Sequence, residues 1–184
     1  MPAETSEDLA ALTVTKFDKA LHDRSAFSCG FGPIDNFLKS SLSDQVKDGM
    51  VAAWIATAGS DPAVLGFYTL GAMSVRAFGP KKWQRARHDI PAIYIRAVAI
   101  REDLQGKGLG TALLINAMNR CLHISSQIGA AAIVLDVLDG ENFDRRWRFY
   151  AGLGFSPLED PDNPRRVYIA MANARKTLAQ IPDI

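Results

Sequence analysis

One stretch near the middle of the chain constrains the fold most. An apolar, β-rich run, Ile93–Ile100, leads through a short polar hinge into the glycine-rich turn Gly106–Gly110, and this turn opens the longest helical pattern, residues 108–128. The first N–H groups of a helix have no partner inside it and carry the positive end of its dipole. Glycines let that backbone approach a phosphate closely. The order of strand, glycine loop and helix therefore predicts an anion site.

The spacing of the glycines limits which phosphate ligand fits. The dinucleotide-binding fingerprint G-x-G-x-x-G fails, because Thr111 stands where its last glycine is needed. The Walker spacing G-x-x-x-x-G-K-[ST] does not occur. What fits is Gln105-x-x-Gly108-x-Gly110 directly after a strand. A glycine-rich turn that only caps the helix is the alternative interpretation.

Composition narrows the class of protein. A chain of 184 residues that is 48% hydrophobic and 22% charged suits one globular domain with a substantial core. A net charge of +1 gives no overall attraction to nucleic acid and leaves only a local basic patch. Two cysteines, Cys29 and Cys121, make no disulfide framework, and the acidic start of the chain is no signal peptide. We expect a soluble cytoplasmic protein with no metal site.

Hydrophobic periodicity predicts the order of the elements. Expected strands cover residues 12–17, 51–58, 63–75, 93–100, 130–138, 154–157 and 165–171, and expected helices cover 33–47, 108–128, 143–152 and 172–180. We expect disorder over 1–10 and an antiparallel hairpin over 51–75. The order predicts an α+β fold, with a central mixed, mostly antiparallel sheet and helices on both faces. The whole chain, 1–184, is expected to be a single domain with a helical tail over 172–184.

A second motif stands at a plausible distance after the first. The loop Gln105–Gly110 matches the Q/R-x-x-G-x-G/A signature of the acetyl-CoA site in GNAT N-acetyltransferases, and Phe149–Phe155 is similar to their F-Y-x-x-x-G-F segment. A chance match to both motifs in this order is much less likely than a match to either alone. The chain therefore resembles a GNAT enzyme, and this resemblance implies the GNAT fold and acetyl-CoA as cofactor.

The resemblance extends to a narrower group. Phe27–Gly30 looks like the F-x-C-G entry of toxin-type GNAT proteins, and Leu65–Leu70 is similar to their V-x-G-Y-Y-T-L strand. The matching region spans about residues 27–171. These toxins belong to type II toxin–antitoxin systems and acetylate the amino group of aminoacyl-tRNA, which blocks translation. The resemblance thus implies an aminoacyl-tRNA substrate, a ribbon-helix-helix antitoxin and a homodimer.

Two departures from the family pattern stand out. The link between Leu138 and Phe149 is longer than the usual short D-E-x-A-x-x-F-Y connection. Asn142 lies near a family asparagine that contacts the pantetheine arm, but it is out of register and receives no such role. The usual Arg-Leu-Ala-Val strand reads Arg96–Ala99 here, a mild change because the strand binds through its backbone.

The resemblance implies transfer of an acetyl group from a thioester to an amine. The needs of this reaction indicate a role for each of the motif residues. The backbone of Val98, Ala99 and Ile100 would pair with the pantetheine amides. The loop would hold the pyrophosphate through Gln105, Gly106, Lys107, Gly108, Leu109, Gly110 and Thr111. Tyr150 would donate its proton to the departing thiolate, because phenol and thiol pKa values of about 10 and about 8.5 are close enough for this. No carboxylate or histidine stands out as the base.

Basic residues gather near both motifs and bear on the acceptor. The expected substrate-binding residues are Arg76, Arg85, Arg87 and Arg96, with Lys81, Lys82, Arg145, Arg146 and Arg148 close to them in the sequence. Such clusters bind phosphates, which favours tRNA; a solvated charged face is the alternative. Phe78 and Trp83 are candidates either to stack on a terminal base or to pack on the core. Competing functions are a GNAT enzyme for a small amine or a protein amino group, and a non-catalytic acetyl-CoA-binding module.

Overall fold

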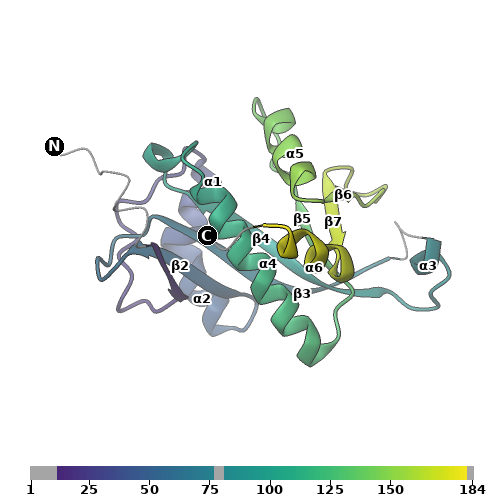
Figure 1. Ribbon diagram of the computed structural model, residues 1–184. Helices are drawn as coiled ribbons and strands as arrows, with labels where there is room; N and C mark the ends of the chain where they lie inside the picture. Colours follow the sequence, from purple (N-terminus) through teal and green to yellow (C-terminus); the bar gives the residue numbers. More distant parts are fainter. Residues whose placement is uncertain (1–11, 77–80, 182–184) are drawn as a thin grey trace. The chain divides into compact units, whose positions relative to one another are not determined.

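The computed structural model describes residues 12–76 and 81–181 (Figure 1). Its strands are β1 (Leu12–Lys16), β2 (Ala52–Ala58), β3 (Gly66–Val75), β4 (Ile90–Ile100), β5 (Ala132–Asp136), β6 (Ser156–Pro157) and β7 (Arg166–Ala170). Its helices are α1 (Gly32–Asn36), α2 (Leu42–Lys47), α3 (Lys81–Gln84), α4 (Leu109–Ile128), α5 (Phe143–Gly152) and α6 (Met171–Ala179), with a π turn η2 (Phe37–Ser41) and a 3₁₀ turn η3 (Glu102–Leu104).

The strands of this described part form one sheet in the order β1-β2-β3-β4-β5-β7-β6. Antiparallel pairs join β1 with β2, β2 with β3, β5 with β7 and β6 with β7. Strands β4 and β5 run parallel, joined by the long α4 as a parallel pair requires. The predicted mixed, mostly antiparallel sheet is therefore confirmed.

The residues group into two compact units. The first unit extends to Leu70 and includes Ala97–Leu114, and the second combines Gly71–Arg96 with the chain from Ile115 on. Strands β3 and β4 contribute residues to both units. Each unit has a hydrophobic core cluster of its own.

In the first unit, helices cover both faces of the strands. Phe67 of β3 points to the face where Leu38 and Leu42 pack, all three fully excluded from water. Its neighbour Gly66 points the other way, because successive strand residues alternate between faces. A Cβ on Gly66 would stand 3.3 Å from a side-chain carbon of Leu113 in α4, so α4 begins against that second face. The expected covering of both faces is confirmed here.

The helix expected over residues 33–47 is interrupted in its middle. Pro33 sits in the first turn of α1, as predicted, but the backbone then widens through the π turn η2, where the Leu42 N–H reaches the Phe37 carbonyl five residues back. Leu38, inside this turn, and Leu42, just after it, are both fully buried. Hydrophobic spacing alone does not reveal such a turn, because both helix types keep apolar residues on one side.

The second unit has its core around β5. Residues Ala132–Leu135 are buried on both faces of the sheet, as the unbroken apolar run predicted. Trp83 of α3 packs into this core, with its ring 5.2 Å from that of Tyr168. Of the two alternatives left open for Trp83, the structure therefore supports packing on the core, because its indole is buried.

Most expected boundaries agree with the structure to within a few residues, and α5 and the end of α4 agree fully. Strand β3 begins later than expected, at Gly66, because Ala63 makes only an isolated bridge to Asp23. The tail forms α6 directly after β7. The disorder expected over 1–10 and the side chain of Phe78 lie outside the described residues. No helix within residues 12–76 and 81–181 is long and apolar enough to cross a membrane.

Candidate functional site

The glycine loop follows β4 and the short turn η3 and leads directly into α4, so the predicted order of strand, glycine loop and helix is confirmed. Gly106 and Gly108 adopt left-handed φ angles of 78° and 85°, which favour glycine. The Ala112 N–H bonds to the Gly108 carbonyl over 3.1 Å, so the N–H groups of Leu109, Gly110 and Thr111 precede the first turn of hydrogen bonds in α4. The loop is exposed from Gln105 to Gly108. These donors therefore lie at the positive end of a twenty-residue helix, directly after the exposed loop.

Gly110 is a glycine that the fold itself does not demand. It lies inside the first turn of α4 and has no left-handed φ. A Cβ at this position would meet only Ile100 Cγ1, at an ordinary 3.9 Å. Alanine would favour the helix by about 0.5–1 kcal/mol. Glycine at this position leaves the backbone open to a group that approaches from outside, as a phosphate does at the start of a helix.

Gln105 supports the loop from within. Its side-chain amide donates to the carbonyls of Cys29, at 2.9 Å, and Ile100, at 3.0 Å, and its own N–H donates to the Glu102 carbonyl at 3.2 Å. Both donor groups of this residue are thus used inside the protein. The sequence assigned Gln105 to the pyrophosphate; in the structure its donors bond to carbonyls that belong to the strand end, to η3 and to the segment before α1.

The Phe27–Gly30 segment provides the other side of this support. The Glu102 N–H donates to the Ser28 carbonyl over 2.8 Å, and a Cβ on Gly30 would stand 3.3 Å from the Glu102 carboxyl group. Asp35 of α1 accepts hydrogen bonds from the Ser28 hydroxyl and the Cys29 N–H. Burial, helped by Asp35, raises the pKa of the Cys29 thiol to about 11, so it stays protonated at neutral pH. Cys29 contributes its carbonyl, and its thiol is no nucleophile.

The end of β4 offers backbone groups next to the loop. The register between β4 and β5 ends at Ile95, so within the described part of the chain Val98, Ala99 and Ile100 lie outside this pairing. The side chains of Ala99 and Ile100 are buried, and the following residue, Arg101, bonds through its N–H to the Leu65 carbonyl at 2.8 Å. The end of β4 is therefore held in place by its buried side chains and by this bond. Backbone groups of an extended strand can pair with an extended ligand.

Tyr150 lies in the second unit, on α5. Its ring is half-buried between Phe149 and Phe155, with centroid distances of 5.2 and 5.9 Å. Among the described residues its hydroxyl has no hydrogen-bond partner. Burial raises the pKa of Tyr150 to about 12, and the nearby Arg146 opposes this in part. The hydroxyl is therefore protonated at every physiological pH and available as a donor.

A cluster of charged side chains crosses β4, β5 and β7 in the same unit. Arg166 donates to both carboxylate oxygens of Asp136, at 2.8 and 3.1 Å, and to Asp160 at 2.9 Å, and Tyr94 donates to Asp136 at 3.0 Å. Burial and the Asp136 carboxylate raise the pKa of Tyr94 to about 12. Sequence reasoning missed this cluster. The signal was present in Asp136, a carboxylate in an otherwise apolar strand.

The glycine loop and the Tyr150 helix both fall within a region shared with a known family. Residues 47–155, more than half of the chain, match the acetyltransferase (GNAT) family. The chain belongs to the GNAT acetyltransferase family.

Two relatives of this GNAT chain are similar over nearly their whole length. The probable toxin TacT of Sinorhizobium fredii (strain NBRC 101917 / NGR234) is 33% identical over 172 residues, covering 90% of this chain and 94% of the relative. The tRNA-acetylating toxin of Mycobacterium tuberculosis (strain ATCC 25618 / H37Rv) is 32% identical over 156 residues, covering 83% and 89%.

Solved structures of the toxin AtaT are also similar. AtaT complexed with acetyl-methionyl-tRNAfMet is 27% identical, with a TM-score of 0.80 over 90% of this chain and 98% of that one. A tyrosine-to-phenylalanine mutant of AtaT, bound to the C-terminus of the antitoxin AtaR and acetyl-CoA, is 26% identical, with a TM-score of 0.77 over 92% and 99%.

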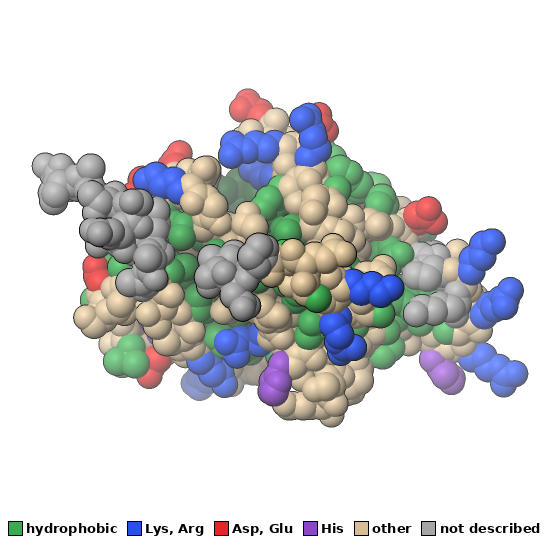
Figure 2. Space-filling model, in the orientation of Figure 1, with side chains coloured by type: hydrophobic (Ala, Val, Ile, Leu, Met, Phe, Trp, Pro, Cys, Tyr) green, Lys and Arg blue, Asp and Glu red, His purple; other side chains and the backbone are tan. Residues whose placement is uncertain are grey.

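The arginines expected to bind substrate in this GNAT chain all lie at the surface. Arg85 and Arg87 follow α3 and are exposed, and Figure 2 shows Lys and Arg side chains gathered around α3. Arg96 is exposed two residues after Tyr94, and its charge opposes only in part the rise that burial causes in the pKa of that tyrosine. Arg76 is exposed and forms an ion pair with Asp162. Their positions leave the guanidinium groups accessible to a large anionic ligand.

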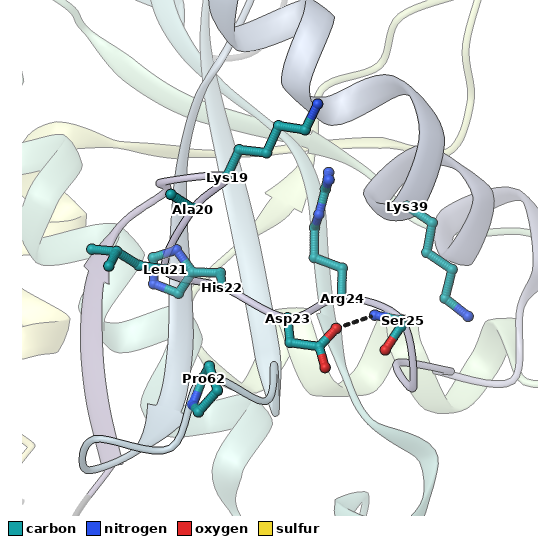
Figure 3. Close-up of a pocket in the computed structure, with 9 residues that line it drawn as sticks. All are labelled: Lys19, Ala20, Leu21, His22, Asp23, Arg24, Ser25, Lys39 and Pro62. Carbon is teal, nitrogen blue, oxygen red and sulfur yellow. Dashed lines mark hydrogen bonds between the residues drawn. The ribbon is translucent and has the colours of Figure 1, made fainter.

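The first unit of the GNAT chain also has a surface hollow of about 610 Å³, shown in Figure 3. Lys19 and Lys39 are exposed at its edge, while Arg24 is bonded to the Leu38 carbonyl and the Ser43 hydroxyl. His22 lies in its wall and bonds to Thr15 and Asp18, so it has a structural role. Asp23, also in the lining, accepts a hydrogen bond from the Ser25 N–H at 2.9 Å.

Proposed function

We propose that this protein is an acetyl-CoA-dependent toxin that acetylates the α-amino group of aminoacyl-tRNA and so blocks translation. The observation that carries the proposal is the open start of α4. Gly110 leaves the backbone uncovered there, although the fold has room for a larger side chain at this position. The relatives named a tRNA-acetylating toxin, and AtaT bound to acetyl-methionyl-tRNAfMet, support this acceptor.

The cofactor would be held by the backbone. The N–H groups from Gly106 to Thr111 would receive the pyrophosphate, and Val98–Ile100 would pair with the pantetheine amides. Gln105 would act by keeping the loop in shape, because its donors are used within the protein. The AtaT complex with acetyl-CoA supports this cofactor.

Tyr150 would serve the departing sulfur. When bound, acetyl-CoA supplies the acetyl group as an activated thioester. A bond forms between the amine nitrogen and the acetyl carbon, the carbon–sulfur bond breaks, and the sulfur leaves with the electron pair and needs a proton. The Tyr150 hydroxyl, with a pKa raised to about 12 and no partner among the described residues, can donate a hydrogen bond and then a proton to that sulfur. Full proton transfer is less favourable than from an ordinary phenol, so the hydrogen bond carries more of the effect.

No residue needs to act as a strong base. The α-amine of an aminoacyl ester is weakly basic, so a large neutral fraction is present near pH 7, and water can take its proton. His22 is engaged in structural bonds and His123 bonds to Gln127, which leaves neither placed as a catalytic base.

The exposed cations of the second unit would bind the RNA. Arg76, Arg85, Arg87 and Arg96 would form a rim that contacts phosphates, since arginine suits them well. The antitoxin AtaR bound to AtaT supports an antitoxin for this chain as well. We propose that this antitoxin is of the ribbon-helix-helix type, as the resemblance to toxin-type GNAT proteins implies. We further propose that the protein is cytoplasmic and forms a homodimer. We also propose that both units belong to one GNAT domain, because the family match includes parts of each.

The test is incubation of the protein with labelled acetyl-CoA and total charged tRNA. We expect label on the α-amino group of one or a few aminoacyl-tRNAs, released as N-acetyl amino acid by mild base. If a protein or a small amine became labelled while charged tRNA did not, the protein would instead be a GNAT enzyme that acetylates a protein amino group or a small amine. Binding of acetyl-CoA without any transfer would identify a non-catalytic module.

A further inference from the structure

Helix α5, which carries Tyr150, is held at its two ends. None of its ten residues, all of them described, is buried, so no apolar face fixes it in the core. After the helix, Leu153 and Phe155 are buried and both donate through their N–H groups to the Tyr150 carbonyl. The C-terminal end is therefore anchored in apolar packing. The N-terminal end needs an anchor of another kind.

Arg146 provides that anchor. Its Nη1 donates to the carbonyls of Leu138 and Asp139, both at 3.2 Å. These carbonyls belong to the chain just beyond β5, where the Val137 N–H still bonds to the Arg165 carbonyl at 2.9 Å. One guanidinium thus ties α5 to the continuation of the pairing between β5 and β7.

Arg146 also lies on the same side of α5 as Tyr150. Residues four apart in a helix are neighbours on its surface. The positive charge of Arg146 lowers the pKa of Tyr150 against the larger effect of burial, so the guanidinium is within electrostatic reach of the phenol. The Tyr150 ring packs against the rings of Phe149 and Phe155. Within residues 12–76 and 81–181 no group bonds its hydroxyl, so the position of the helix and the packing of the ring together determine where that hydroxyl lies.

The link that Arg146 closes is the part in which this chain is longer than the family pattern. A longer link has more conformations, and Gly140, with a φ of 107°, adds freedom in its middle. Arg146 is half-buried and spans the link from its far end to its start, whereas its neighbours Arg145 and Arg148 are exposed. Its engagement with two carbonyls separates it from the cations available for RNA.

We propose that Arg146 is a positioning residue for Tyr150, which holds the N-terminal half of α5 against the end of β5 and thereby fixes the hydroxyl. This inference rests on the proposed role of Tyr150 in protonating the departing sulfur. Arg146 itself acts through the helix and touches neither substrate nor cofactor.

The first test compares Arg146→Met, which keeps the aliphatic stem, with Arg146→Lys, which keeps the charge and one donor. For Arg146→Met we expect kcat with charged tRNA to fall by up to about 100-fold, as a displaced catalytic group causes, while KM for charged tRNA and affinity for acetyl-CoA stay unchanged. Arg146→Lys should recover part of kcat. Arg175→Met, an exposed arginine of α6, is the matched control and should retain wild-type kcat.

The second test places Arg146→Met in a Tyr150→Phe background. If Arg146 acts through Tyr150, the double variant should be no slower than Tyr150→Phe alone, because the two residues act as a unit. Losses that multiply would overturn the proposal. So would a raised KM for tRNA and a reduced salt dependence with kcat unchanged, since these would make Arg146 a phosphate contact.

A readout without activity keeps the two proposals apart. Hydrogen exchange of the amides of residues 139–150 should be faster in Arg146→Met than in the wild type and in Arg175→Met. If the wild type fails to acetylate charged tRNA, the proposed function falls, but this exchange result still tests the anchor. Unchanged exchange would overturn the role of Arg146 whatever the activity.

Discussion

The side-chain amide of Gln105 donates to the main-chain carbonyl of Cys29 at 2.9 Å, across 76 residues of sequence. This bond joins the glycine loop to the segment before α1. We predict that Gln105→Leu weakens acetyl-CoA binding about fivefold to tenfold, since a neutral hydrogen bond contributes about 0.5–1.5 kcal/mol. Calorimetry with acetyl-CoA measures this. Gln180→Leu, at an exposed position after α6, should bind as the wild type does.

Gly110→Ala should separate the needs of the fold from those of the ligand. The new methyl group meets only Ile100 at 3.9 Å, so we expect an equal or higher free energy of unfolding, by up to about 0.5–1 kcal/mol. Acetyl-CoA affinity should nevertheless fall, and Gly110→Asp should reduce it further by charge repulsion. Chemical denaturation and calorimetry on the same sample give both quantities. A stabilised variant with wild-type affinity would remove Gly110 from the cofactor site.

Tyr150→Phe should keep acetyl-CoA affinity and lose about 10²–10⁴-fold in turnover, the usual contribution of a general acid. Its pH behaviour follows from the raised pKa. Since the folded pKa of about 12 exceeds the unfolded value of about 10, the phenol keeps its proton below pH 10 and costs stability only as pH rises from there toward 12. Turnover up to pH 10 should therefore show no loss assignable to Tyr150. The measurement is the difference in phenolate absorbance between the wild type and Tyr150→Phe during a pH titration. This difference should appear only near pH 12, and a transition near pH 8 would contradict the prediction.

Reversing Arg85 and Arg87 to Glu should abolish acetylation of charged tRNA and spare acetyl-CoA binding. If these residues bind phosphates, a plot of the logarithm of tRNA affinity against the logarithm of salt concentration should become shallower. The slope should change by about 0.7–0.9 for each phosphate that is no longer neutralised. The matched control reverses Lys19 and Lys39, which makes the same charge change at the hollow of the first unit. If both double variants lost tRNA acetylation equally, the loss would come from the changed net charge and not from these two arginines.

Arg166→Met should destabilise the second unit. It leaves Asp136 and Asp160 without their cation, and the paired side chains of Arg166 and Asp136 are only 19% and 23% exposed. Removing one partner of a buried pair costs about 3 kcal/mol or more, and this partial exposure places the expected loss at the low end. Urea unfolding measures it, with Arg175→Met as the control.

The sequence predicted those features that depend on neighbours along the chain. The apolar run before the loop, the glycine spacing and the amphipathic pattern of α4 are local, and each led to the right element. The π turn at Phe37–Ser41 was missed, because it changes the hydrogen bonds without changing the apolar face. The partners of Gln105 and Arg166 were missed for another reason. The bonds from Gln105 to Cys29 and from Arg166 to Asp136 join residues 76 and 30 positions apart, and only the fold brings them together.

The bond from Gln105 to Cys29 also determines how the protein can be shortened. The part of the chain that matches the GNAT family begins at residue 47, after Cys29, and ends at 155, before Arg166. A fragment cut at those limits would contain the glycine loop and the Tyr150 motif, yet the Gln105 side chain would lose one of its two acceptors and Asp136 its guanidinium partner. Boundaries chosen from family resemblance would therefore run through the structure that supports the chemistry, and a minimal active fragment must reach from before Phe27 to beyond β7.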